Sequence, residues 1–367
     1  MESSIKILSV AVAIYFLTSN LYGVFLPIYF RENGLSLLEI IEVLLFTFLV
    51  IGLLPCLLLR LTRKFEAIIT LGIFTTMIFN LVLIFIKNPI VLGFLYGLSI
   101  ATFWPSFNLL QFRLSRVETR ARTISFLSST IPSVTGIIGP AIGGFIIEKF
   151  GFIALFASSI MLYIVAFLLS INIKFEYETL QFEIPKAKIF RVFFATFVII
   201  GVLESYWLAY PFFVSRVSGT ILNMGIVYAL SGILIAIATF FVNWLSDIRG
   251  TRVEFAIIGA IFYAIWYFAI AYASTMLEIV LLSAFSGLAS AFMLSWFAHY
   301  ADSFPREYYA SILVLMEVGL MIGRIINLPP TYFLIGENNY ATYFILLGIV
   351  SLFLIPLYVV AKPLQQQ

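Results

Sequence analysis

Apolar segments long enough to cross a lipid bilayer recur along the whole chain, separated by short polar or charged stretches. A helix needs about 20 apolar residues to span the roughly 30 Å hydrocarbon core, and in lipid the backbone must satisfy its own hydrogen bonds. Twelve segments meet this requirement, near residues 5–30, 37–59, 67–86, 90–112, 123–147, 152–171, 190–214, 223–244, 254–274, 277–299, 310–335 and 340–361. The sequence therefore predicts an all-α integral membrane protein with about 12 transmembrane helices.

The composition supports this prediction and excludes several classes of protein. Of the 367 residues, 62% are hydrophobic and 11% are charged, whereas a soluble domain has about a quarter charged residues. No basic block suits nucleic acid, and the single cysteine, Cys56, has no partner for a disulfide or a Cys-based metal site. A G-x-x-x-x-G-K-[S/T] nucleotide motif is also missing. We expect a lipid bilayer as partner and no cofactor, metal or nucleic acid.

The distribution of basic residues predicts the orientation of the chain. If both termini face the cytoplasm, sixteen of the 21 Lys and Arg residues lie on the inner side, and four, Arg31, Lys87, Lys149 and Arg216, lie on the outer side. Short cytoplasmic loops carry the excess of Lys and Arg in membrane proteins. We therefore expect a multi-pass protein of the plasma membrane with both termini in the cytoplasm.

The longest polar stretch divides the chain into two halves of similar length. We predict an N-terminal six-helix bundle over 1–171, a central cytoplasmic linker over 172–189 and a C-terminal six-helix bundle over 190–367. The halves also resemble each other weakly, because Asn20-Leu21-Tyr22 with Pro27 matches Glu204-Ser205-Tyr206 with Pro211. Such matches are typical of duplication. A site between two repeats can be opened to either side of the membrane by rocking one repeat against the other.

This organisation resembles the major facilitator superfamily over almost the whole chain. In the fifth span, Gly139-Pro140-Ala141-Ile142-Gly143-Gly144 matches the G-P-x-x-G-G pattern of the family's drug and metabolite antiporters. After the eighth span, Asp247, Gly250 and Arg252 match a loop signature of the family, and Arg60 and Arg63 keep the basic positions after the second span. The resemblance implies two pseudo-symmetric bundles, rocker-switch alternating access and a monomer.

Two positions depart from the pattern of the family's proton-coupled drug exporters. Leu59 replaces the acidic residue of the first loop signature, and Pro89 stands where an arginine usually precedes Gly93. The G-P-x-x-G-G pattern favours export, and small residues there would let helices approach while Pro140 bends the helix. Packing alone, without any bearing on the direction of transport, is the alternative interpretation of that pattern.

Glu204, Glu317 and Arg324 lie in the interior of predicted spans, where an ionisable residue costs about 2.5 to 3.5 kcal/mol on insertion scales and is a functional candidate by default. Glu204 lies in the seventh span and either exchanges protons or fixes helix packing through hydrogen bonds. Glu317 and Arg324 are seven residues apart in the eleventh span and share one helix face. Arg324 either binds an anionic group of the substrate or is neutralised by Glu317 or Glu204.

Amide and aromatic residues complete the predicted cavity lining, because apolar pockets with a few polar groups bind amphipathic organic molecules. The candidates are Asn20, Tyr22, Trp104, Asn108, Tyr206, Trp207, Tyr210 and Trp296. A cytoplasmic gate is predicted from Arg60, Arg63, Asp247 and Arg252, with Asp247 pairing with Arg252 or Arg306.

The leading hypothesis is secondary transport of a small organic solute, with protons as a candidate coupling ion and efflux of drug-like or metabolite molecules as the favoured direction. The alternative is an uptake or facilitated-diffusion permease for a sugar or an organic anion. A membrane enzyme is less well supported, since clustered carboxylates or a nucleophile beside a base are missing from the loops. We therefore expect no enzymatic activity.

Overall fold

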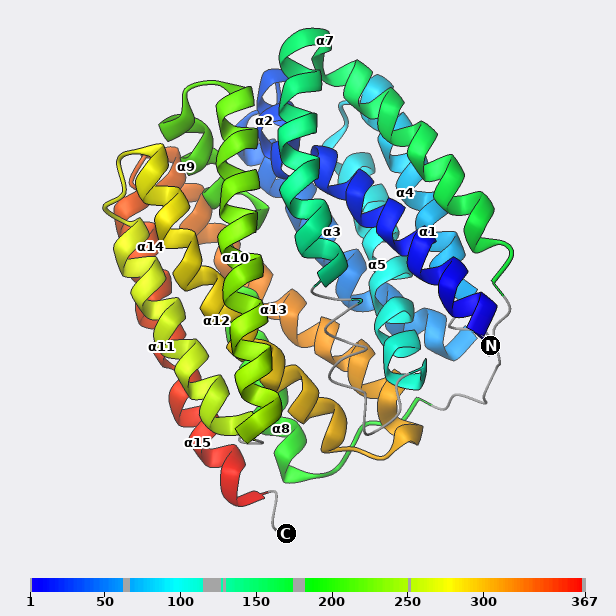
Figure 1. Ribbon diagram of the computed structural model, residues 1–367, viewed down its shortest axis with the longest axis vertical. Coiled ribbons are helices and arrows are strands. Elements are labelled where there is room, and N and C mark those ends of the chain that lie inside the picture. Colours follow the sequence, from blue (N-terminus) through cyan, green and yellow to red (C-terminus); the bar gives the residue numbers. More distant parts are fainter. Residues whose placement is uncertain are drawn as a thin grey trace.

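The computed structural model describes residues 2–61, 67–114, 127, 130–173, 182–249 and 252–364. Within these ranges the regular structure is helical and contains no strand. The first described helix begins, and the last described helix ends, in the lower half of the view in Figure 1.

The helices run in two consecutive sets. The first set is α1 (Glu2–Tyr22), the 3-10 helix η1 (Gly23–Phe25), α2 (Leu26–Glu32), α3 (Leu37–Leu61), α4 (Ile68–Phe85), α5 (Pro89–Leu114) and α7 (Ile131–Ser170). The second set is α8 (Lys188–Val202), η5 (Ser205–Trp207), α9 (Ala209–Ser218), α10 (Ile221–Arg249), α11 (Arg252–Ile270), α12 (Met276–Asp302), η6 (Arg306–Tyr308), α13 (Tyr309–Gly336), α14 (Tyr340–Leu352) and α15 (Leu354–Leu364).

The described residues contain eleven helical segments that are long and apolar enough to cross a membrane. One of them, the 40-residue α7, joins two helices at Gly151, where φ is 80° and ψ is 172°. A side chain would disfavour this positive φ, so a glycine ends the first helix. The described segments therefore provide twelve crossings, which confirms the predicted all-α fold.

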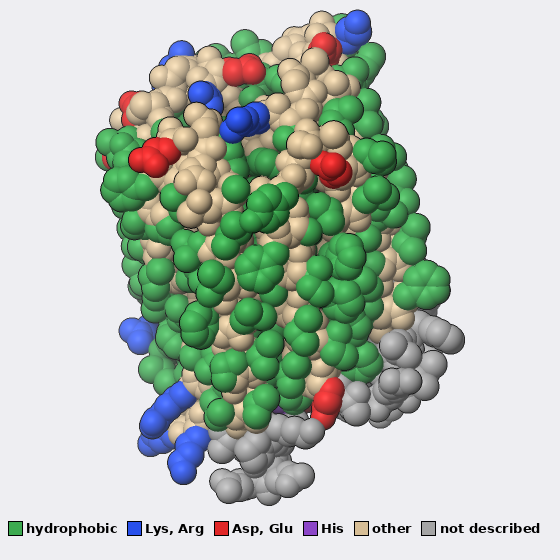
Figure 2. All heavy atoms as spheres, turned by 90° about the vertical axis from the view of Figure 1, so that its left-hand side faces the viewer, with side chains coloured by type: hydrophobic (Ala, Val, Ile, Leu, Met, Phe, Trp, Pro, Cys, Tyr) green, Lys and Arg blue, Asp and Glu red, His purple; other side chains and the backbone are tan. Residues whose placement is uncertain are grey.

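The surface has the pattern that a bilayer requires. Figure 2 shows a broad hydrophobic band between two ends where charged side chains gather. Large apolar side chains within the spans are exposed, among them Leu53, Met161 and Phe333, which are 54%, 69% and 63% exposed. An apolar surface of this extent would be an aggregation hazard in water, and it is the surface that lipid tails cover.

Each set of helices packs mainly on itself, and a few pairs join the two sets. In the first set, α1 packs on α7, and α5 packs on α3 and α4. In the second, α12 packs on α10 and α11, and α8 packs on α13. The main contacts between the sets are those of α7 with α10 and α3 with α13. The molecule is thus built from two six-helix bundles with a seam between them.

The first span of each bundle is broken at an equivalent place. The first changes from α-helix to 3-10 helix at Gly23, and the seventh loses helical geometry between Val202 and Ala209. Proline removes a backbone donor and its ring clashes with the carbonyl four residues earlier. Pro27 and Pro211 lie four residues after Gly23 and Trp207, so the two matched prolines explain the two breaks.

The glycines of the G-P-x-x-G-G segment allow close helix contact on two sides of α7. A Cβ atom on Gly139 would lie 2.7 Å from the Cβ of Asn20, and one on Gly143 would meet the carbonyl of Leu21. On another side, a Cβ on Gly144 would lie 3.3 Å from the Cα of Leu222 in α10. The small residues therefore permit contact both within a bundle and across the seam. A bend at Pro140 stays a prediction, since α7 departs from helical φ and ψ at Gly151.

Candidate functional site

Two adjoining cavities lie along the seam between the bundles. The larger, which we name the C-terminal chamber, has a volume of about 670 Å³. Its walls include Glu204, Tyr210, Ser231, Tyr263, Trp266 and Trp296. The other, the N-terminal chamber, has a volume of about 510 Å³, and its walls include Tyr15, Tyr22, Thr76, Tyr96, Ser99 and Trp104. These sizes suit small organic molecules.

The two chambers share part of their lining. Asn20, Val24 and Pro132 of the first bundle and Tyr206 and Tyr228 of the second face both cavities. Tyr206 lies within the break of the seventh span and is 55% exposed. The shared residues place the broken first spans of the two bundles at the junction of the chambers.

A buried triad of charged side chains stands at this junction. The Arg324 guanidinium binds both oxygens of Glu204, with Nε 2.5 Å from Oε2 and Nη2 3.0 Å from Oε1. Its Nη1 lies 3.4 Å from Oε2 of Glu317, about two helical turns away on the same face of α13. The side chains of Glu204, Glu317 and Arg324 are 12%, 7% and 7% exposed. A bidentate arginine–carboxylate contact is among the stronger polar interactions in proteins.

Aromatic rings enclose the triad. The Trp207 indole N–H donates to Oε2 of Glu204 at 2.6 Å, and the Arg324 guanidinium lies 5.5 Å from the centre of the Trp207 ring. On the other side of the seam, the Phe48 ring lies 5.8 Å from the same guanidinium. These rings exclude water and strengthen the electrostatic contacts of the triad.

The triad reaches both chambers. Glu204 lines the C-terminal chamber, whereas Glu317 and Arg324 line the N-terminal chamber. The break before Ser205 makes this possible, because it turns Glu204 out of a regular helix and leaves the carbonyl of Leu203 to accept a hydrogen bond from the Tyr267 hydroxyl. Non-helical backbone within a membrane span is tolerated where other groups of the protein satisfy it.

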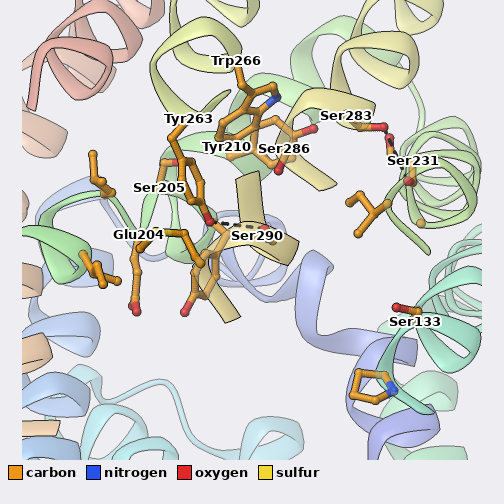
Figure 3. A pocket seen from close by; sticks show the side chains of 18 of the residues that line it. Ser133, Glu204, Ser205, Tyr210, Ser231, Tyr263, Trp266, Ser283, Ser286 and Ser290 are labelled. Carbon is orange, nitrogen blue, oxygen red and sulfur yellow. Dashed lines mark hydrogen bonds between the residues drawn. The ribbon is translucent and has the colours of Figure 1, made fainter. Parts of the chain in front are cut away.

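Serines along one face of α12 give the C-terminal chamber a polar wall. Ser283, Ser286 and Ser290 are spaced by three and four residues, so they share a helix face. Figure 3 shows them along α12, with the Tyr263 hydroxyl 3.3 Å from Oγ of Ser290. Ser283 donates to the carbonyl of Ser231 on α10. The face continues as an apolar wall through Met293 and Phe297.

Most of the lining residues predicted from the sequence lie at the chambers. The N-terminal chamber receives Tyr22, Trp104 and Trp207, and the C-terminal chamber receives Tyr210 and Trp296. Asn20 and Tyr206 face both. Asn108 is different, since it is buried on α5 and is not part of the lining of either chamber.

The predicted gate residues are only partly described. Arg252 pairs with Asp302 at the lower end of the molecule, and both side chains are more than a third exposed. The guanidinium of Arg60 lies 4.8 Å from the ring centre of Phe182, a residue of the predicted linker. Arg63 and the side chain of Asp247 lie outside the described part of the chain. A gate built on Asp247 therefore stays a prediction.

Several lining residues were missed from the sequence. Trp266, Tyr228 and Ser231 line the C-terminal chamber, as do the three serines of α12. The spacing of these serines within an apolar segment was the available signal for a polar face. Trp266 and Tyr228 carry no such signal, because aromatic residues make up 17% of the chain. Among the described residues, no three His, Cys, Asp or Glu side chains gather as a metal site would require.

Comparison with solved structures identifies proteins of the same fold. The human organic anion transporter MFSD10 (TETRAN) has a TM-score of 0.72 at 11% identity, over 96% of this chain and 98% of that one. Two structures of FucP, described as the E. coli fucose:proton symporter, each have a TM-score of 0.68, at 15% and 14% identity. Both matches cover 97% of this chain and 98% of the other. No significant match was found among curated protein sequences.

The family assignment comes from the sequence itself. The family model described as Major Facilitator Superfamily matches residues 8–182 and 192–366. This is nearly the whole chain, taken as two segments of equal length, and its family and fold are those of membrane transporters. The chain belongs to the Major Facilitator Superfamily.

Proposed function

We propose that this protein is a proton-coupled secondary transporter that carries a small organic solute through the two chambers by alternating access. The observation that carries the proposal is the sharing of one arginine by two buried carboxylates at the junction of the chambers. Such a triad can bind and release a proton within reach of a solute in either cavity.

The charge balance of the triad supports a role for protons. With all three groups ionised, Glu204, Glu317 and Arg324 carry one net negative charge, and each is at least 88% buried. An uncompensated charge in this environment is costly, so binding of one proton stabilises the triad when it is closed to water. Contact of a chamber with water lowers that cost and lets the proton leave.

The contacts of the two carboxylates differ, and they favour Glu317 as the proton-binding group. Glu204 accepts two hydrogen bonds from Arg324 and one from Trp207, all at 3.0 Å or less. Glu317 has one contact, at 3.4 Å, and is 6% exposed. Hydrogen bonds to a carboxylate favour its charged form, whereas burial disfavours it. The proton therefore binds Glu317 while Glu204 stays paired with Arg324.

Export is the direction we propose, because Gly139-Pro140-x-x-Gly143-Gly144 resembles the pattern of antiporters and lies on the seam. In this scheme the bundles 1–171 and 190–367 move as two bodies joined by 172–189, with both termini in the cytoplasm of a plasma-membrane protein. Uptake through the same site is the alternative.

Reporter enzymes fused at residues 88 and 367 would test the orientation: activity of a periplasmic reporter is expected at residue 88 and not at the C-terminus.

Coupling is tested with purified protein in liposomes that contain a pH-sensitive dye. A panel of candidate solutes is added under an imposed pH gradient, and proton movement is recorded with each solute. We expect one chemical class to accelerate proton movement in the wild type, and we expect Glu317→Gln to abolish this acceleration while the solute still exchanges across the membrane.

The matched control is Glu32→Gln, which makes the same chemical change at an exposed residue at the end of α2. It is expected to behave as the wild type. Solute-driven proton movement that persists in both Glu317→Gln and Glu204→Gln would rule out the triad as the coupling site.

A further inference from the structure

We propose that the C-terminal chamber binds an uncharged amphipathic solute whose hydrogen-bond acceptor oxygens lie along one side. This inference rests on the proposed function and specifies the substrate class of the same site. It is carried by buried donor groups at the chamber that have no partner in the described part of the chain.

Four polar atoms of the chamber lining have no hydrogen-bond partner among the described residues. They are Nε1 of Trp266, Nε1 of Trp296, the hydroxyl of Tyr228 and the hydroxyl of Ser231. Trp266 and Trp296 are 6% and 1% exposed. Because an indole N–H can only donate, each of the two tryptophans requires an acceptor atom. Buried donors without a partner destabilise a protein, so a cluster of them at a cavity indicates a ligand rich in acceptor oxygens.

The charges at the chamber argue against a charged solute. Glu204 is the one charged residue among the described residues that line it. Both oxygens of this carboxylate are already bound by Arg324, and one also accepts from Trp207. A cation would have to compete with Arg324 for Glu204. An anion would lose its hydration and face a carboxylate, and the described residues of the lining include no cation. An uncharged solute avoids both costs.

The two walls of the chamber differ in polarity. Hydroxyl and indole groups come from α10, α11 and α12, where Figure 3 shows Ser231, Trp266 and Ser286 around one part of the pocket. Apolar lining comes from α8 and α13, through Phe197, Ile200 and Leu320. A solute with oxygens along one side and a hydrocarbon or aromatic surface on the other matches these two kinds of lining. The volume of about 670 Å³ admits a molecule of two or more rings.

The test uses compounds that differ in charge on a constant skeleton. One trio is 4-nitrophenyl β-glucoside, the corresponding glucuronide and the corresponding glucosaminide, which are neutral, anionic and cationic. A second trio is methyl biphenyl-4-carboxylate, biphenyl-4-carboxylate and 4-biphenylmethylamine. Equilibrium affinities for the purified protein are measured by calorimetry without a pH gradient. We expect the tightest binder to be uncharged, with an affinity at least tenfold above that of its charged relatives.

Variants then test whether the unpartnered donors bind the best uncharged compound. Trp266→Phe and Trp296→Phe remove the N–H and keep an aromatic ring, and each is expected to weaken affinity about tenfold, which corresponds to 1.4 kcal/mol. Ser231→Ala provides a smaller change if a tryptophan variant does not fold. The control is Tyr300→Phe, because the Tyr300 hydroxyl donates to the carbonyl of Ile312 and lines neither chamber.

Three outcomes would overturn the inference: a charged compound binds most tightly, no uncharged member of either trio binds, or the Trp→Phe variants bind as the wild type does. The outcome of these binding measurements does not depend on proton coupling, because the affinities are measured at equilibrium without a pH gradient. If both Glu317→Gln and Glu204→Gln leave proton movement intact, the coupling proposal fails and the affinities still decide the solute class. If a charged compound binds best while Glu317→Gln abolishes coupling, the solute class alone is wrong.

Discussion

The two bundles place different chemistry at equivalent positions. Asn20 of the first span and Glu204 of the seventh are matched in the internal repeat and both line the C-terminal chamber. Asn20 donates to the Thr135 hydroxyl at 3.0 Å, a neutral contact within its own bundle. Glu204 instead binds Arg324 in a charged, bidentate contact.

The same difference extends through the surroundings of the two residues. In the first bundle, hydroxyls near the N-terminal chamber pair with one another, as Ser19 and Tyr22 do with Tyr163 at 2.8 and 3.1 Å. In the second bundle, the indole N–H groups of Trp266 and Trp296 have no partner among the described residues. Two bundles of one architecture thus differ at the seam: the first contributes paired hydroxyls, and the second contributes the charged triad and these two indole groups.

The largest expected effect comes from making the second bundle resemble the first by removing its buried cation. Arg324→Met leaves two buried carboxylates without their cation and should destabilise the protein by about 3 to 5 kcal/mol. Thermal unfolding in detergent measures the loss. The triple variant Arg324→Met, Glu204→Gln, Glu317→Gln contains no charge and should regain most of the stability. An Arg324→Met protein as stable as the wild type would contradict the ion triad.

A smaller effect is expected from Gly143→Ala, which tests packing within the first bundle. The added methyl group would meet the carbonyl of Leu21 in α1, and such overpacking typically costs about 1 to 3 kcal/mol. The matched control is Gly136→Ala on the same helix, where the nearest atom to a new Cβ is 3.8 Å away. Unfolding midpoints should fall for Gly143→Ala and stay near the wild-type value for Gly136→Ala.

Gly225→Ala applies the same chemical change across the seam. Its methyl group would meet the carbonyl of Pro140 in the other bundle, so closure of this region should become less favourable while each bundle stays intact. A minor state at 1% to 10% lies only a few kcal/mol away, so we expect a several-fold shift toward the state in which α7 and α10 are apart. Distances between spin labels on α7 and α10 measure this. An unchanged distance distribution would show that α7 and α10 accommodate the added methyl group without a change in the free energy of their contact.

The smallest effect should follow loss of the exposed ion pair below the seam. Asp302→Asn removes the partner of Arg252, and the two side chains are 36% and 38% exposed. Exposed pairs contribute about 0 to 1 kcal/mol and are screened by salt. The unfolding midpoint should therefore change little at physiological ionic strength, in contrast to the change caused by Arg324→Met. A loss of stability comparable to that caused by Arg324→Met would mean that α11 and α12 pack tightly against each other at this end of the protein.

The sequence predicted the fold well because a bilayer leaves few alternatives to long apolar helices. It also identified Glu204, Glu317 and Arg324, since charged residues are rare in such segments. The sequence left Glu317 and Glu204 open as partners of Arg324, and the structure shows contacts with both. The geometry of these contacts could not be predicted, because it depends on how two spans 120 residues apart are rotated against each other. The lack of a partner for the Trp266 N–H among the described residues was beyond prediction for the same reason. One aromatic residue among many has no distinctive sequence signal.

The matched breaks near Pro27 and Pro211 allow the upper end of the molecule to open by movement of short helices instead of whole spans. Each break separates a short helix, the 7-residue α2 and the 10-residue α9, from the rest of its span. The two short helices contact each other, and the Arg31 guanidinium of α2 lies 5.6 Å from the centre of the Phe212 ring of α9. Because each break separates the short helix from the α-helical segment before it, α2 and α9 can tilt together while those longer segments keep their packing.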